Sequence, residues 1–197
     1  MLCQAYAAQG HRVMGVDPAA AMLAVAKRGD PGDLVSWAQS RSEDFRSDRT
    51  FDLIIMTGHA FQVLLGDAQV EATFATMAAH LNPDGLITFE SRNPALNWDA
   101  IWGRTYKMDT PQGPVRAARR MTDTSRSPDY LSFAWDYHFA DETLTSESTL
   151  RFMSHREIVS FAEAAGLRLV QLFGDWDGSK FDADTSREMI FKFRRSD

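Results

Sequence analysis

Cysteine and long apolar runs are scarce in this 197-residue sequence, and positive charge is not in excess. The one cysteine, Cys3, excludes a disulfide framework within the chain and fits a reducing compartment. No apolar run is long enough to span a bilayer, and residues 1–12 lack the basic and apolar regions of a signal peptide. The net charge of -6 gives no overall attraction to nucleic acid or anionic membranes. We therefore expect a cytoplasmic protein without nucleic-acid or membrane partners.

Several common catalytic and metal-binding motifs are also missing. The sequence has no G-x-S-x-G nucleophile turn, no H-E-x-x-H motif and no paired cysteines. The acids of "DWDG" and "DADT" do not complete a twelve-residue calcium loop, so we interpret them as turn formers. Five scattered histidines do not indicate a metal centre. The sequence thus predicts no metal ligands.

Strand-like and helix-like segments alternate through the first half of the chain. Short apolar runs predict strands at residues 11–16, 34–38, 51–56 and 86–90. Helix-like segments before or between these strands cover residues 2–9, 19–28 and 68–81. This order indicates an α/β fold with a parallel sheet and right-handed crossovers.

The pattern changes after Pro94. Residues 95–114 are rich in aromatic residues and show no periodicity. Three antiparallel strands are expected next, at residues 115–124, 130–139 and 143–152, separated by the turns "SRSPD" and "ADET". We interpret residues 95–153 as a β-rich cap inserted into a core formed by residues 1–94 and 154–197.

The C-terminal segment predicts an antiparallel end to the sheet. Ser154 and Glu157 form a capping-box pattern that begins a helix. Strands are expected at residues 167–173 and 187–193, and the turn-rich loop between them contains no helix. A link without a crossover helix favours antiparallel pairing.

Taken in order, these stretches resemble a known family. "HRVMGVDPAAAMLAVAKR", "WAQSRSEDF", "FDLIIMTGHAFQVL" and "LNPDGLITFESRNP" resemble the second to fifth strands, with their following loops, of class I S-adenosylmethionine-dependent methyltransferases of the small-molecule type. The resemblance implies a Rossmann-like sheet with an antiparallel C-terminal hairpin. It also implies S-adenosylmethionine as cofactor and a small-molecule methyl acceptor. The alternative is a non-catalytic remnant or binding module that has lost cofactor binding.

The sequence differs from the family pattern at its N-terminus. The family opens with a strand and a G-x-G-x-G loop, whereas the first glycine here is Gly10, at the end of the first helix-like segment. We expect the central strand between residues 11–16 and 51–56 to be missing, either because the sequence starts late or because the protein natively lacks it. Unpaired strand edges would then lower stability and promote homo-oligomers through the gap.

The resemblance places the cofactor at the ends of the second, third and fourth strands. Asp17, at a strand tip, can accept hydrogen bonds from both ribose hydroxyls. An alternative role, compatible with ribose binding, is that Asp17 starts the next helix with Pro18; the alternative for Met22, which would lie against the adenine, is a core methionine. The cofactor-binding residues predicted in this way are Asp17, Pro18, Met22, Arg41, Ser42, Met56, Thr57, Gly58 and Phe61.

The acceptor is expected beyond the fourth and fifth strands. His59 is the candidate catalytic base, with a hydrogen-bonded loop histidine as the alternative. Some of the aromatic residues in this region can instead pack the cap onto the core. The predicted acceptor-binding residues are Gln62, Arg92, Asn93, Trp98, Trp102 and Tyr106.

Overall fold

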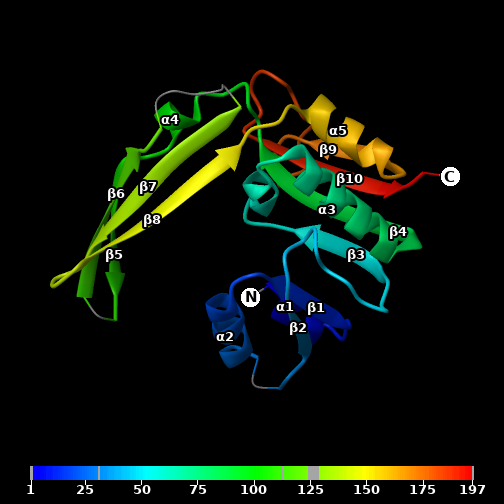
Figure 1. Ribbon diagram of the computed structural model, residues 1–197, viewed down its shortest axis with the longest axis horizontal. Helices are drawn as coiled ribbons and strands as arrows, with labels where there is room; N and C mark the ends of the chain where they lie inside the picture. Colours follow the sequence, from blue (N-terminus) through cyan, green and yellow to red (C-terminus); the bar gives the residue numbers. More distant parts are fainter. Residues whose placement is uncertain (1, 31, 112, 124–128, 197) are drawn as a thin grey trace.

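The computed structural model describes residues 2–30, 32–111, 113–123 and 129–196. Within them the strands form three sheets, with orders β1-β2, β3-β4-β10-β9 and β5-β6-β7-β8 (Figure 1). The helices other than α4 lie with the first two sheets, and the third sheet, with α4 beside it, projects away from them (Figure 1). The protein is therefore of the mixed α/β class predicted from the sequence.

The first half alternates as predicted. Its elements are α1 (Leu2–Ala8), β1 (Val13–Asp17), α2 (Ala20–Arg28), β2 (Val35–Gln39), β3 (Phe51–Met56), the short 3-10 helix η1 (Ala60–Val63), α3 (Asp67–His80) and β4 (Leu81–Arg92). β1 runs parallel to β2, and β3 runs parallel to β4. The segment "NPDG", whose composition is typical of a turn, instead lies inside β4, where the register against β3 shifts.

The antiparallel sheet has one strand more than the sequence predicts. It follows α4 (Trp98–Ile101) and consists of β5 (Thr105–Thr110), β6 (Gly113–Met121), β7 (Tyr130–His138) and β8 (Thr143–Arg151). β5 was missed because "TYKMDT" is mostly polar and exposed, and it becomes a strand by pairing with β6. Most of the predicted "SRSPD" turn lies outside the described residues. A small apolar cluster at the base of this sheet contains Trp98, Leu131, Phe133, Leu150 and Phe152.

The C-terminal prediction is confirmed. α5 (His155–Ala164) begins with the predicted capping box between Ser154 and Glu157, and β9 (Leu167–Phe173) follows. β10 (Glu188–Arg195) then pairs antiparallel with both β9 and β4. The last strand is thus inserted next to β4, in the interior of the four-stranded sheet.

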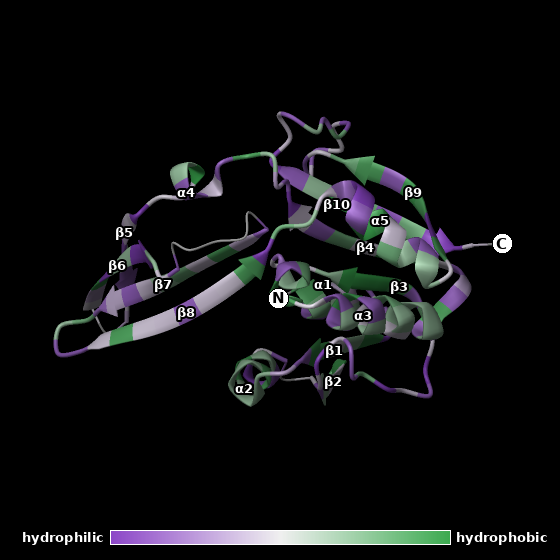
Figure 2. Cartoon of the chain, turned by 45° about the horizontal axis from the view of Figure 1, so that its top comes forward, coloured by the Kyte–Doolittle hydropathy of each residue, from purple (hydrophilic) through white to green (hydrophobic). Residues whose placement is uncertain are grey.

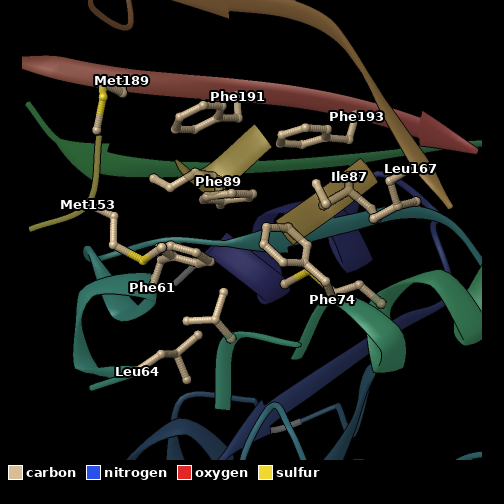
Figure 3. Packing of buried hydrophobic residues seen from close by; sticks show 14 of the residues in the cluster. Phe61, Leu64, Phe74, Ile87, Phe89, Met153, Leu167, Met189, Phe191 and Phe193 are labelled. Atoms are coloured by element: carbon tan, nitrogen blue, oxygen red, sulfur yellow. The ribbon is translucent and has the colours of Figure 1, made fainter. Parts of the chain in front are cut away.

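The main core lies on the face of this sheet covered by α3 and α5 (Figure 3). Its phenylalanine rings stack: the centroid of Phe89 is 4.6 Å from that of Phe61 and 5.1 Å from that of Phe191. Each such buried side chain contributes about 1.5–3 kcal/mol relative to an exposed one. In Figure 2, β3 is coloured mostly as hydrophobic and β8 mostly as polar, as expected for a core strand and a strand of the projecting sheet.

The strands β1 and β3 do not pair with each other. Among the described residues β1 pairs only with β2, and β3 only with β4, so each has an edge without a strand partner. Val16 on β1 and Leu53 on β3 are both exposed, although they lie in apolar strands. The expected interruption of the central sheet is therefore present in the structure.

We predict that the protein self-associates through these open edges. Leu53→Lys should shift sedimentation-velocity profiles toward monomer, because a charged residue on an edge strand disfavours pairing with another chain. The matched control is Leu144→Lys, which changes an exposed leucine on β8. An equal shift with Leu144→Lys would place the association on the projecting sheet instead, and no self-association of the parent protein would refute the prediction.

A second prediction concerns the close packing of β1 on β2. A Cβ atom added to Gly15 would lie 2.2 Å from the Trp37 ring, so Gly15→Ala forces these paired residues apart. We expect a loss of about 1–3 kcal/mol in the free energy of unfolding, measured by urea denaturation. Gly103→Ala is the control, because an added Cβ meets nothing within 4 Å there. Equal stability of the two variants would contradict this packing.

Candidate active site

The predicted site residues fall into two groups, one after β1 and β2 and the other after β3 and β4. The first group lies near a hollow of about 410 Å³, which Pro18 and Arg41 help to line and Asp17, Met22 and Ser42 do not. The lining residues are Pro18, Gln39, Ser40, Arg41 and Asp44. Asp17 is the last residue of β1, directly before Pro18. Asp17 Oδ1 accepts a hydrogen bond from the Ala19 amide at 2.7 Å, and Oδ2 has no hydrogen-bond partner among the described residues.

This first group has the chemistry needed to hold an adenosine. A carboxylate oxygen that faces no donor can accept hydrogen bonds from ribose hydroxyls. Met22, at the start of α2, is 58% exposed, so it is not a core methionine. Its side chain is therefore free to lie against a ring.

The loop after β2 is connected to α3 by hydrogen bonds of Ser42 and Glu43. Ser42 Oγ lies 3.1 Å from Thr73 Oγ1, and Gln69 Nε2 donates to Glu43 Oε1 at 3.3 Å. Burial opposes ionisation of Glu43, but hydrogen bonds from its own backbone, Gln69 and Ser42, together with nearby Arg41, hold its pKa below the ordinary value. Ser42 thus supports the loop, while Arg41 lines the hollow.

The second group begins with the exposed residues Thr57 and Gly58 at the end of β3. Gly58 has φ 74° and His59 has φ 57°, so the chain takes two left-handed residues in succession. This conformation is uncommon for a histidine. Glu90 holds it in place, because Glu90 Oε1 accepts the His59 backbone N–H at 2.9 Å. Met56 contacts the core cluster just before this turn.

The His59 ring is engaged by an acid that sequence reasoning missed. His59 Nε2 lies 2.9 Å from Glu188 Oε2, and the two side chains are 23% and 17% exposed. Glu188 is the first residue of β10 and pairs with Arg92 of β4. His59 therefore lies between two carboxylates, Glu90 at its backbone and Glu188 at its ring.

Arg92 brings together several of the residues predicted to bind the acceptor. Its Nη1 donates to Gln62 Oε1 at 2.8 Å, and its guanidinium lies 4.8 Å from the Trp102 ring centroid and 5.6 Å from that of Trp98. Burial lowers the pKa of Arg92, whereas the charges of Glu188 and Glu90 act in the opposite direction. The Arg92 guanidinium, which lies between two acids and two indole rings, is therefore the main polar group among the residues predicted to bind the acceptor.

Other predicted residues have structural contacts. Phe61 is buried in the core stack, and Gln62 is 1% exposed. The Asn93 side chain makes hydrogen bonds with the backbone only: its amide nitrogen donates to the Ala183 and Ser186 carbonyls, and its amide oxygen accepts from the Ala95 N–H. Trp98 is buried and donates to the Asn93 carbonyl. Tyr106 packs against Trp135, farther along the projecting sheet.

Sequence reasoning also missed Gln39, Ser40 and Asp44, which line the hollow. The signal that could have identified Glu90 was a lone carboxylate in the apolar strand "LITFES". For Glu188 it was an acid at the start of "MIFKF". Within the described ranges, no group of three or more His, Cys, Asp or Glu residues is arranged to hold a metal ion. In the same part of the chain, no helix has the length and apolarity needed to cross a membrane.

We predict that Glu90 supports the His59 turn through its acceptor oxygen. Glu90→Leu should lower the free energy of unfolding by about 1–3 kcal/mol, because it removes the acceptor of the partly buried His59 backbone N–H. Glu90→Gln retains an acceptor oxygen and should lose much less. Urea denaturation of both variants measures the difference. Equal losses would show that the charge or the packing of Glu90 matters rather than this hydrogen bond.

Comparison with known proteins agrees with this architecture. Residues 1–85 match the family model described as a methyltransferase domain. No curated protein sequence matches the chain.

Solved structures match over nearly the whole chain. An S-adenosylmethionine-dependent methyltransferase from Clostridium acetobutylicum has a TM-score of 0.78 at 13% identity, covering 95% of this chain and 76% of its own. The CcbJ methyltransferase from Streptomyces caelestis has a TM-score of 0.78 at 20% identity, with 98% and 78% covered. CalS10 from Micromonospora echinaspora, an amino pentose methyltransferase solved with S-adenosylmethionine bound, has a TM-score of 0.66 at 21% identity, with 94% and 74% covered. The predicted resemblance is thus confirmed: residues 1–85 match the methyltransferase-domain family, and the chain has the Rossmann-like fold of class I S-adenosylmethionine-dependent methyltransferases.

Proposed function

We propose that this protein transfers a methyl group from S-adenosylmethionine to a small-molecule acceptor in the cytoplasm. The observation that carries the proposal is Asp17 at the end of β1, whose Oδ2 has no hydrogen-bond partner among the described residues and which directly precedes Pro18 in the lining of the hollow. A carboxylate at a strand end of an open α/β sheet is suited to binding a ribose. The similarity of residues 1–85 to a methyltransferase domain supports the same cofactor.

The residues of the first group would hold the adenosine part of the cofactor. Asp17 would accept the ribose hydroxyls, with Met22 and Pro18 against the adenine and Arg41 at its edge. Thr57 and Gly58 would supply backbone contacts, because Gly58 has no side chain to block close approach. When bound, the cofactor supplies a methyl group activated by a sulfonium.

The acceptor would lie near His59 and Arg92. Arg92 contacts both Gln62 and Trp102 there, and its guanidinium can orient a polar small molecule. Residues 95–153 would act as a cap over this region. In-line placement of the acceptor nucleophile against the methyl group can supply most of the rate enhancement in such transfers. The relative CalS10 is an amino pentose methyltransferase, which supports a small, polar acceptor such as a sugar.

Calorimetric titration with S-adenosylhomocysteine tests the cofactor assignment. We expect binding by the parent protein and about tenfold or greater weakening in Asp17→Asn, because loss of a hydrogen bond to a charged group costs about 1.5–3 kcal/mol. Asp17→Asn retains an oxygen that can accept from the Ala19 amide. Asp48→Asn, which changes an exposed acid of the loop before β3, is the control. Absence of binding by the parent protein would favour a non-catalytic member of the fold.

A further inference from the structure

We propose that Glu188 is a positioning residue that fixes the His59 tautomer whose free Nδ1 takes a proton from the methyl acceptor. This inference rests on the proposed function and narrows its substrate class. The acceptor nucleophile must carry both a lone pair and a proton, so it is a hydroxyl or an N–H-bearing neutral amine. His59 and Glu188 meet at 2.9 Å although they are separated by 129 residues in the chain.

The chemistry of a carboxylate determines the tautomer. An ionised carboxylate can only accept hydrogen bonds, so His59 Nε2 must carry the proton that faces Glu188. In a neutral ring Nδ1 then has a lone pair, and it makes no hydrogen bond with the described residues. The ring is 23% exposed, which leaves it accessible to a bound molecule and to solvent.

Two further contacts make this arrangement rigid. The His59 backbone N–H donates to the side chain of Glu90, which is 3% exposed and lies on strand β4. Glu188 is opposite Arg92 in the β4–β10 ladder, so its backbone is fixed by strand pairing. A base oriented by an acid, with the acid held by a rigid element, is the arrangement that general-base catalysis requires.

The proposed step balances in atoms and charge. The lone pair of the acceptor oxygen or nitrogen forms a bond to the methyl carbon, and the electron pair of the broken carbon–sulfur bond stays on sulfur. The proton of the nucleophile passes to His59 Nδ1, and the resulting imidazolium keeps its Nε2 proton in the hydrogen bond to Glu188. Solvent then removes the proton from the partly exposed ring.

The decisive experiment reads the tautomer by nitrogen NMR on protein labelled with 15N-histidine, with His59→Gln identifying the His59 signal. The parent protein should show the Nε2–H form alone. Glu188→Gln should show both forms, because an amide both donates and accepts. Glu163→Gln, an exposed acid on α5, should leave the spectrum unchanged. The same single tautomer in Glu188→Gln and the parent would overturn the proposal.

A kinetic measurement adds a readout that a packing role would not affect. The probes are sugars bearing one amine or one free hydroxyl, incubated with S-adenosylmethionine, and S-adenosylhomocysteine formation is followed. We expect His59→Gln and Glu188→Gln to reduce kcat by about 10²- to 10⁴-fold while thermal melting stays near that of the parent. Unchanged kcat in Glu188→Gln would overturn the proposal. The NMR result does not depend on the cofactor, so failure of S-adenosylhomocysteine binding would refute the proposed function separately.

Discussion

The antiparallel pairing of β10 with β4 is the contact on which most of this structure depends. It places Phe191 opposite Phe89 in the core and Glu188 opposite Arg92 at the site, within a single ladder. Residues 89 and 90 of β4 point to opposite faces of the sheet because strand side chains alternate. The same register thus sets the packing of the aromatic core and the relative positions of the charged groups. A slip of one residue would disrupt both.

Burying the charged groups at the end of β4 costs desolvation free energy. Electrostatic attraction between groups of opposite charge offsets part of this cost. Glu90 is almost completely buried, and one of its oxygens has no hydrogen-bond partner within the described part of the chain. Arg92 offsets this cost, since it interacts electrostatically with both Glu90 and Glu188 and lies over the indole rings. Such a cluster adds little to net stability compared with an apolar core. We relate its presence in the interior to the function proposed above.

The sequence predicts local elements well where one physical rule dominates. "FDLIIM" is apolar except for Asp52 and forms a strand over the expected residues, and the Ser154–Glu157 pair starts its helix as a capping box should. The polar β5 could not be found this way, because its strand conformation comes from pairing with β6 and not from its own composition. Asp17 could be selected because it ends an apolar strand. Glu188 could not, because its partner is 129 residues away and only the tertiary fold brings the two together.

The contact between His59 and Glu188 also has a consequence for synthesis of the protein. All residues up to and including Glu188–Arg195 must be made before β10 can enter the sheet beside β4. Until then β4 has an exposed edge and Phe89 lacks its neighbours Phe191 and Phe193. Domains generally fold as units, so the nascent chain would remain without an ordered site until its last strand left the ribosome. Premature termination before residue 188 would therefore yield a chain lacking both a central core strand and the acid beside His59.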